Sequence, residues 1–253
     1  MPMYKEAAFP ESLKGVIIQD QPDRVRFPQL LNGEIHLWTA SLVPSMDKIE
    51  RLRSFLSPEE KKKASYYKFE RKQHGYIVTQ AVLRILISAY LDIDPADVML
   101  VASKKGKPFL INEPSLFFNN SNSDEICVYA FSRDAEVGID IEKIRELPDI
   151  DQLIEKNLTS REKAYLLKNS DHKLSLFFQF WTFKESYLKA IGEGMRLPPA
   201  NLEFLLDDGN IRLLSVTYGF EATDWQFKGF TREGNYTGTL TYQRRDTIIR
   251  EMK

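Results

Sequence analysis

Two carboxylates, Asp140 and Glu142, stand two positions apart in the stretch from Val137 to Glu142. Apolar residues alternate there with small or acidic ones, which is the period of a half-buried β-strand. Both carboxylates therefore point from one face, with about 7 Å between their Cα atoms. Oxygen ligands at this separation can share one divalent cation, and Mg²⁺ usually takes one or two carboxylates plus substrate phosphates. We expect Gly138, on the same face, to leave the space beside the pair open.

A second pair of charged residues, Glu185 and Lys189, has the i, i+4 spacing of neighbours on one helical face. An exposed ion pair of this kind is common and contributes only a few tenths of a kcal/mol. Here the surrounding face is densely aromatic and apolar, with Phe178, Trp181 and Leu188. A carboxylate beside such side chains loses solvation, so its pKa should rise unless a cation offsets the loss. Glu185 therefore suits metal ligation or general-base catalysis.

Two further segments have residue types that bind phosphate. Residues 104–108 (Lys-Lys-Gly-Lys-Pro) form a basic stretch, and residues 119–123 (Asn-Asn-Ser-Asn-Ser) are rich in hydrogen-bond donors. We interpret both as turns. Taken singly, each is more typical of a plain solvent-exposed loop.

The elements that must position these residues come in two similar series. In the first, a strand starts at Glu34, and Ser57-Pro58-Glu59-Glu60 predicts a capping box at the start of a helix that runs to Phe69. A longer helix is predicted over 73–91. Strands are predicted at 98–102, 109–111, 116–118 and 126–131.

The second series has the same order. Glu136 opens a strand, Thr159-Ser160-Arg161-Glu162 is another capping box, and a long helix covers about 174–191. Strands are predicted near 202–206, 211–216, 225–230 and 236–242. The pairs 34/136, 57/159 and 60/162 are each 102 positions apart. We predict an α+β fold in which a strand-helix-helix-strands unit is duplicated about a pseudo-twofold axis. The lobes are predicted at 34–134 and 135–253, after an irregular N-terminal extension over 1–33.

The repeat provides an internal control on the acidic residues. At the same offset, Asp140 and Glu142 correspond to Trp38 and Ala40, and Glu185 corresponds to Leu83. Acids present in only one of two equivalent copies are better explained by chemistry than by folding.

Composition narrows the class of protein. The chain has 253 residues, a formal net charge of −1 and a single cysteine, Cys127. It therefore has no global basic field for nucleic acid, no intramolecular disulfide and no multi-cysteine zinc site. We see no signal segment and no apolar run long enough to span a bilayer, so we expect a cytoplasmic protein with no membrane association. A duplicated chain can form its own cleft, so we expect a monomer.

Together and in this order, the segments resemble the 4′-phosphopantetheinyl transferase superfamily, in its two-lobed surfactin-synthetase-activating type. The most specific parts are Gly138-Ile139-Asp140-Ile141-Glu142 and the segment from Trp181 to Lys189, which contains Lys184-Glu185-Ser186. Weaker support comes from Gly106-Lys107-Pro108, from Phe118-Asn119 with Ser121 and Ser123, and from Leu83-Arg84.

The resemblance implies coenzyme A in the cleft between the lobes and Mg²⁺ as cofactor. It implies transfer of the phosphopantetheine arm to a serine of an acyl or peptidyl carrier protein, with release of 3′,5′-ADP. By the same resemblance, Asp140, Glu142 and Glu185 would hold the metal. Glu185 would also help remove the serine proton, and Lys189 would contact the phosphates. Coenzyme A would be bound by Lys63, Lys107, Ser121, Asn122 and Lys189.

Three departures reduce the positive charge around the predicted nucleotide. Asn122 replaces the usual histidine of a Ser-His-Ser turn, Lys72-Gln73-His74-Gly75 stands where arginines are frequent, and Glu60 stands where some members carry a base. Asn122 can donate a hydrogen bond but has no charge. The main alternative is therefore a non-catalytic module of the same fold that binds coenzyme A or a carrier protein. A magnesium-dependent phosphohydrolase is a third, weaker interpretation.

Overall fold

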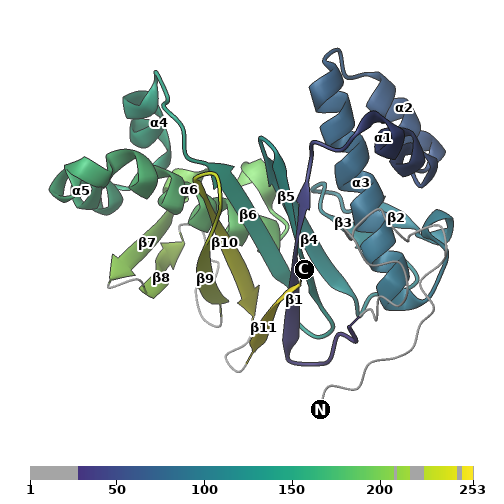
Figure 1. Cartoon of the computed structure of the whole chain (residues 1–253). Helices are drawn as coiled ribbons and strands as arrows, with labels where there is room; N and C mark the ends of the chain where they lie inside the picture. Colours follow the sequence, from purple (N-terminus) through teal and green to yellow (C-terminus); the bar gives the residue numbers. More distant parts are fainter. Residues whose placement is uncertain (1–27, 208–209, 217–224, 244–246, 253) are drawn as a thin grey trace.

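The structure is a computed structural model that describes residues 28–207, 210–216, 225–243 and 247–252. The predicted N-terminal extension therefore lies largely outside the described residues. The fold is α+β, as predicted: Figure 1 shows two lobes side by side, each with a sheet and helices of its own. No helix in these ranges combines the length and apolar character that crossing a bilayer requires.

The first lobe contains three helices and five strands in the order of the chain. They are β1 (Glu34–Ser41), α1 (Met46–Ser54), α2 (Pro58–Ser65), α3 (Glu70–Leu91), β2 (Leu100–Ala102), β3 (Pro108–Leu110), β4 (Phe117–Ser123) and β5 (Ile126–Ser132), with a 3₁₀ turn at Pro95–Asp97. The predicted capping box is present, because Ser57 Oγ accepts from the Glu60 amide and Glu60 Oε2 accepts from the Ser57 amide. Helix α1 has no counterpart in the prediction.

The second lobe has the same order of elements. They are β6 (Val137–Lys143), α4 (Ile150–Asn157), α5 (Ser160–Lys168), α6 (Lys173–Ala190), β7 (Leu202–Asp207), β8 (Asn210–Val216), β9 (Trp225–Arg232) and β10 (Tyr236–Gln243), with 3₁₀ turns at Ser170–His172, Gly194–Arg196 and Pro199–Asn201. Thr159 and Glu162 form the second capping box. Descent of the two lobes from one duplicated unit stays a prediction.

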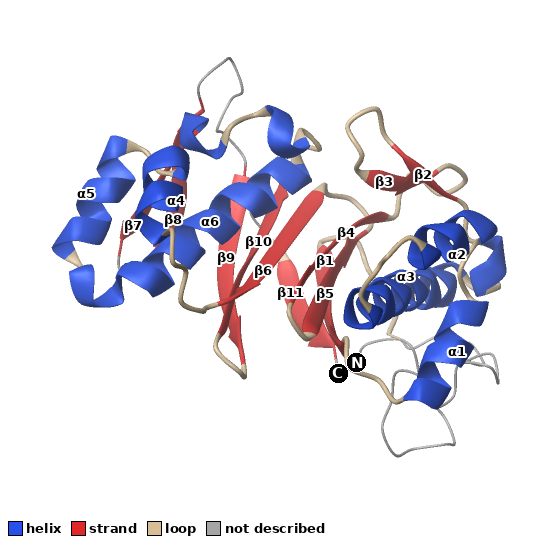
Figure 2. Ribbon diagram, turned by 90° about the horizontal axis from the view of Figure 1, so that it is seen from above, coloured by secondary structure: helices blue, strands red, loops and turns tan. Residues whose placement is uncertain are grey.

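Two sheets form the centre of the molecule. One consists of β11 (Ile248–Met252), β1, β5 and β4 in that order, and the other has the order β6-β10-β9, while β2–β3 and β7–β8 are separate two-stranded sheets. Strand β11 (Ile248–Met252) was not predicted; it follows β10 in the chain but pairs in parallel with β1 of the first lobe. Seen from above in Figure 2, the helices lie on the outer sides and the two sheets between them.

Apolar residues from both sheets share one buried layer. Ile35, Val128, Ile139 and Leu240 come from four different strands of the two sheets and belong to one core cluster. Separate clusters surround α3 and α6. The lobes are therefore joined by hydrophobic packing, the main source of folding free energy.

At the junction, β4 lies along β6 and bonds to it through side chains. The Ile139 amide donates to Asn119 Oδ1 at 2.9 Å, and the Lys143 amide donates to Ser123 Oγ at 3.0 Å. Residues 119–123, predicted as a turn, are thus part of a strand. Its polar side chains, rather than its backbone, form the hydrogen bonds to β6. The turn prediction was wrong because the side chains of Asn119, Ser121 and Ser123 make contacts inside the molecule rather than with water.

The space beside Gly138 is filled, contrary to expectation. A Cβ atom at this position would lie 2.0 Å from the backbone oxygen of Ser186 and 2.4 Å from the Ala190 amide nitrogen. Only glycine lets the backbone of α6 approach β6 this closely. The contact places Glu185 and Lys189 of α6 next to Asp140.

Candidate active site

Three elements meet at the predicted acidic residues. Strand β6 provides Asp140 and Glu142, α6 provides Glu185 and Lys189, and β4 provides Ser121. The alternation in β6 and the i, i+4 spacing in α6 place these side chains on facing surfaces, as the sequence predicted. Five of the predicted site residues are therefore neighbours, although β6 and the end of α6 lie far apart in the chain.

Asp140 is the centre of a hydrogen-bonded group. Its Oδ1 accepts from Lys189 Nζ and from Ser121 Oγ, both at 2.7 Å. Lys189 Nζ also donates to Ser121 Oγ at 2.8 Å and to the Ile139 carbonyl at 3.3 Å. Asp140 is 4% exposed, so this charge-assisted contact is largely shielded from water.

The other two carboxylates are held less fully. Glu142 Oε2 accepts from Ser123 Oγ at 2.7 Å and lies 3.9 Å from Arg145. Burial, followed by the charge of Asp140, raises the pKa of Glu142. Burial and the same neighbouring charge raise the pKa of Glu185 to about 7. The predicted rise in the pKa of Glu185 is confirmed in direction. The two raised pKa values indicate that the cations nearby do not fully neutralise these carboxylates.

Two oxygens of this cluster are buried without a hydrogen-bond partner, Asp140 Oδ2 and Glu185 Oε1. Buried polar atoms are normally paired, and an unpaired carboxylate oxygen is costly. In the described part of the chain, no group of three or more His, Cys, Asp or Glu side chains is arranged to hold a metal ion. The donor set nevertheless fits one, since Mg²⁺ prefers carboxylate oxygens and would supply the missing positive charge.

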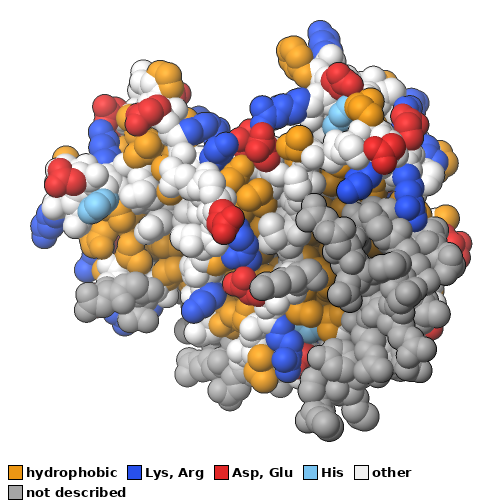
Figure 3. Space-filling model, in the orientation of Figure 1, with side chains coloured by type: hydrophobic (Ala, Val, Ile, Leu, Met, Phe, Trp, Pro, Cys, Tyr) orange, Lys and Arg blue, Asp and Glu red, His pale blue; other side chains and the backbone are white. Residues whose placement is uncertain are grey.

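A groove between the lobes leads to this cluster. It has a volume of about 780 Å³ and is lined by residues of both lobes, among them Tyr76, Asn122, Glu142 and Arg145. Figure 3 shows the hollow between the lobes, with Lys and Arg side chains on both sides of it. Of the predicted coenzyme A ligands, Asn122 faces this groove, and Lys63 lies above the ring of Tyr76, with its Nζ 5.3 Å from the ring centroid.

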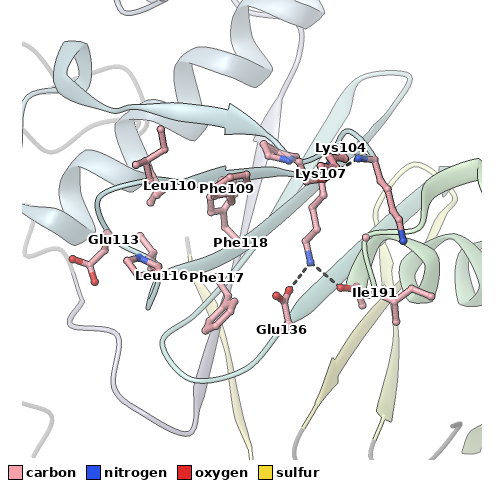
Figure 4. A pocket seen from close by; sticks show the side chains of 17 residues that line it. Lys104, Lys107, Phe109, Leu110, Glu113, Leu116, Phe117, Phe118, Glu136 and Ile191 are labelled. Carbon is pink, nitrogen blue, oxygen red and sulfur yellow. Dashed lines mark hydrogen bonds and ion pairs between the residues drawn. The ribbon is translucent and has the colours of Figure 1, made fainter. Parts of the chain in front are cut away.

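Lys107 lies apart from the acids. It follows a turn in which Gly106 has a φ of 93°, a conformation that favours glycine. Its Nζ donates to Glu136 Oε2 at 2.6 Å and to the Ala190 carbonyl at 2.8 Å. Figure 4 shows these bonds at the edge of a second cavity of about 560 Å³ whose wall includes Phe109, Phe117 and Ile191. Lys107 thus joins the first lobe to the end of α6, and its predicted contact with coenzyme A stays a prediction.

Ser123 and Arg145 both contact Glu142, and these two roles were not predicted from the sequence. A usable signal was present in residues 117–123, where positions 119, 121 and 123 alternate as they do in a strand. That alternation predicts Ser121 and Ser123 on one face. The contact of Arg145 depends on the chain direction after β6 and has no comparable signal.

Comparison with known protein families identifies this arrangement. The model of the "4'-phosphopantetheinyl transferase superfamily" matches residues 136–241, which contain β6 and α6. The model "4'-phosphopantetheinyl transferase, N-terminal" matches residues 40–134. Together they cover both lobes. The chain belongs to the 4′-phosphopantetheinyl transferase superfamily.

Individual relatives agree with this assignment. The chain is 32% identical over 170 residues to the 4′-phosphopantetheinyl transferase HetI of Nostoc sp., covering 66% of this chain and 72% of the relative. It is 30% identical over 170 residues to the 4′-phosphopantetheinyl transferase Sfp of Bacillus subtilis, covering 67% and 71%. It is 28% identical over 192 residues to the human L-aminoadipate-semialdehyde dehydrogenase-phosphopantetheinyl transferase, covering 68% and 62%. The predicted resemblance and the enzyme class are confirmed.

Proposed function

We propose that the chain transfers the 4′-phosphopantetheine arm of coenzyme A to a serine hydroxyl of an acyl or peptidyl carrier protein, with Mg²⁺ as cofactor. The serine oxygen forms a bond to the phosphorus that carries the pantetheine. The bond from that phosphorus to the bridging oxygen breaks, and 3′,5′-ADP leaves. Family membership supports the transfer. The observation that carries the residue roles is the buried, incompletely neutralised acid cluster beside Lys189.

The chain's own residues suit this reaction. Lys189, already bonded to Asp140 and Ser121, presents a fixed cation where phosphate charge would develop. Glu185, whose pKa lies near 7, can accept the serine proton directly or through a water. Phosphoryl transfer depends mainly on positioning and charge neutralisation, so a rigid set of charges between β4, β6 and α6 is well suited to it.

Asp140, Glu142 and Glu185 are the residues that would hold Mg²⁺. When bound, the ion would polarise the phosphoryl oxygens and stabilise the charge of the departing group. The unpaired oxygens of Asp140 and Glu185 and the raised pKa values of Glu142 and Glu185 support this ligand set. Lys63, Lys107, Ser121 and Asn122 are proposed coenzyme A contacts. A cytoplasmic location, a monomeric state and the absence of nucleic-acid or membrane partners stay predictions.

The decisive assay incubates the protein with coenzyme A, Mg²⁺ and an apo carrier domain. The carrier should gain the mass of the phosphopantetheine arm. Coenzyme A binding without any mass gain on several carriers would favour the alternative, a non-catalytic binding module. Release of free phosphate would favour a phosphohydrolase.

Asp140→Ala tests the residue assignment. Transfer should fall by at least about a hundredfold, because the variant loses a proposed metal ligand and the partner that orients Lys189. Circular dichroism should show an unchanged fold, since Trp38 stands at the corresponding position of the first lobe. Glu50→Ala, an exposed acid of α1, is the matched control and should keep full activity. Retained activity in Asp140→Ala would remove the metal and positioning roles given to this residue.

A further inference from the structure

Two pairs of buried hydroxyl groups join α6 to β10. Thr182 Oγ1 lies 2.9 Å from Thr239 Oγ1, and Ser186 Oγ lies 2.7 Å from Thr241 Oγ1. All four residues are fully buried between the helix and the sheet, and Figure 2 shows α6 over the sheet that contains β6 and β10. None of these hydroxyls belongs to the acid cluster, so their role in the molecule is separate from metal or phosphate binding.

The direction of each hydrogen bond follows from the remaining contacts. Each helix hydroxyl also donates to a carbonyl of α6 three residues earlier, at 2.9 Å for Thr182 and 3.0 Å for Ser186. A hydroxyl group has only one proton to donate, so in each pair the helix hydroxyl accepts and the threonine of β10 donates. Thr239 and Thr241 are therefore the donors that connect the sheet to α6.

The two donors stand next to the acid cluster in the sheet. In the ladder between β6 and β10, Thr239 is the direct partner of Asp140, and Thr241 is the direct partner of Gly138. Directly opposite residues of an antiparallel pair project from the same face. The face that presents Asp140 to α6 therefore also presents both threonines.

The same relation holds on the helix. Thr182, Glu185, Ser186 and Lys189 have the spacing i, i+3, i+4 and i+7, which places them on one helical face. Any slide or rotation of α6 that breaks the hydroxyl pairs therefore also displaces Glu185 and Lys189.

Only one axial position of α6 satisfies both pairs. The rise over four helical residues, about 6 Å, matches the rise over two strand residues, about 6.7 Å. A slide by one helical turn would bring Phe178 opposite Thr239 or Ala190 opposite Thr241, and one buried hydroxyl would lose its partner. An unpaired buried hydroxyl is costly, whereas the apolar packing around α6 is non-directional and selects no register.

We infer that Thr239 and Thr241 are positioning residues for the transfer reaction. By donating to the two hydroxyls of α6 they fix its axial position, and so hold Glu185 and Lys189 beside Asp140. The inference rests on the proposed function and adds to it two residues that do not touch the substrate. A displacement of about 1 Å at a site of this kind can lower the rate about a hundredfold.

The test replaces both donors with valine, which has the shape of threonine but no hydroxyl. In Thr239→Val/Thr241→Val, kcat should fall at least about tenfold, while KM for the carrier changes less than about twofold because the groove is not altered. Thr239→Ser/Thr241→Ser keeps both donors and should restore kcat to within about threefold of the wild type.

A second readout does not depend on transfer. Added Mg²⁺ should raise the melting temperature of the wild type and of the serine variant. In the valine variant the rise should be at most about half as large, because Glu185 no longer lies beside the other proposed ligands. A merely structural loss would lower the melting temperature equally with and without Mg²⁺ and would leave the rise unchanged.

Ser88→Ala in the first lobe is the matched control. Ser88 is buried in α3, and its Oγ donates to the Ile85 carbonyl at 2.9 Å, three residues earlier, as Ser186 does in α6. Among the described residues, no strand hydroxyl bonds to Ser88. The variant should be less stable than the wild type but keep its kcat and its response to Mg²⁺.

If the wild type transfers but the valine variant keeps the kcat and the Mg²⁺ response of Ser88→Ala, the positioning role is wrong and the proposed function stands. Equal losses in the valine and serine variants would assign the effect to packing of the methyl groups and would also overturn the inference. If the wild type modifies no carrier, the proposed function fails, and the Mg²⁺ response alone decides whether the threonines position the acids. Should the double valine variant not fold, Thr239→Val and Thr241→Val, which each keep one pair, give the same comparison.

Discussion

The two lobes share a Glu–cation pair that fixes the position of their long helices. In each, the glutamate that closes a capping box also pairs with a buried cation of the long helix, and that cation donates to two backbone carbonyls further along the chain. The groups are Glu60 and Arg84 with the carbonyls of Pro95 and Val98 in the first lobe, and Glu162 and Lys184 with those of Pro199 and Leu202 in the second.

The lobes differ where the long helix meets the strand. In the first lobe, His36 and Trp38 of β1 reach α3 through hydrogen bonds to Tyr90 Oη, both at 2.8 Å. Burial lowers the pKa of His36 to about 4, so the ring is neutral near pH 7. In the second lobe, Gly138 and Asp140 stand at the positions that correspond to His36 and Trp38. The backbone of α6 then lies directly against β6.

This difference distinguishes the residues that serve the fold from those that serve the reaction. The capping boxes and the buried cations occur in both lobes, so they serve the fold. The acids occur in one lobe only. With the offset of 102 positions between the lobes, the counterpart of Glu185 is Leu83. If the lobes are instead aligned on the buried cations Arg84 and Lys184, which are 100 positions apart, the counterpart is Ile85. Both are buried and apolar, so either alignment shows an acid where the fold accepts a hydrophobic side chain.

The largest effect on stability is expected from breaking the Glu–cation pair in either lobe. Lys184→Met and Arg84→Met should each lower the free energy of unfolding by about 3–5 kcal/mol, because each leaves a glutamate without its cation: Glu162, whose side chain is fully buried, and Glu60, whose side chain is 14% exposed. The losses should be similar, since both cations have the same kinds of partner. Chemical denaturation at pH 7.5 measures both.

The control for this pair is an ion pair at the surface. Lys163 pairs with Glu155 at 2.6 Å, but the Glu155 side chain is 77% exposed. Lys163→Met should cost less than about 1 kcal/mol. If Lys184→Met were as stable as Lys163→Met, the Glu–cation pairs of the two lobes would not be equivalent in their contribution to stability.

A smaller effect is expected from the close contact of α6 with β6. Gly138→Ala should lower the free energy of unfolding by about 1–3 kcal/mol, because the new methyl group must push the backbone of α6 away. Transfer activity should fall as well, since the same shift moves Glu185 and Lys189 from Asp140. Denaturation and the carrier assay measure the two effects on one variant.

Gly75→Ala is the matched control in the first lobe. A Cβ at this helical position would meet only Leu42 Cδ1, at 4.0 Å. Alanine should therefore stabilise α3 by about 0.5–1 kcal/mol. Equal behaviour of the two alanine variants would contradict the view that Gly138 is required for close packing.

Much of this fold could be predicted from local patterns. The capping boxes at Ser57 and Thr159 and the alternation in β6 are determined by neighbouring residues, so the sequence contains the full signal. Strand β11 could not be predicted, because its partner β1 is more than two hundred residues away. Helices α1 and α4 were missed; Ser45 and Asp149 precede them without a side-chain cap hydrogen bond.

The site shows the same division. The facing positions of Asp140, Glu185 and Lys189 follow from strand and helix periods together with one family resemblance. The filled space beside Gly138 could not be predicted in this way. A glycine indicates that another part of the chain approaches closely, but not which part. The bonds of Lys107 to Glu136 and the Ala190 carbonyl depend on how the lobes meet, and no local pattern encodes them.

The last effect on stability concerns Glu185, and like that of Gly75→Ala it is a gain rather than a loss. Its folded-state pKa of about 7 lies above the ordinary value of 4.5, so the folded state loses stability as pH rises through this window. Glu185→Gln removes that loss. In metal-free buffer at pH 8, the variant should be more stable than the wild type by about 1–3 kcal/mol, an upper range because the carboxyl is partly exposed.

Thermal unfolding between pH 4 and pH 8 checks this prediction. The melting temperature of Glu185→Gln should exceed that of the wild type at pH 8, and the two should converge near pH 4, where the wild-type carboxyl is protonated. Glu50→Gln, an exposed acid of the first lobe, should follow the wild type throughout. Added Mg²⁺ should stabilise the wild type more than Glu185→Gln, because only the former keeps all three proposed ligands. A variant less stable than the wild type at pH 8 without metal would mean that Glu185 serves the fold, and the contrast between the lobes would lose its clearest member.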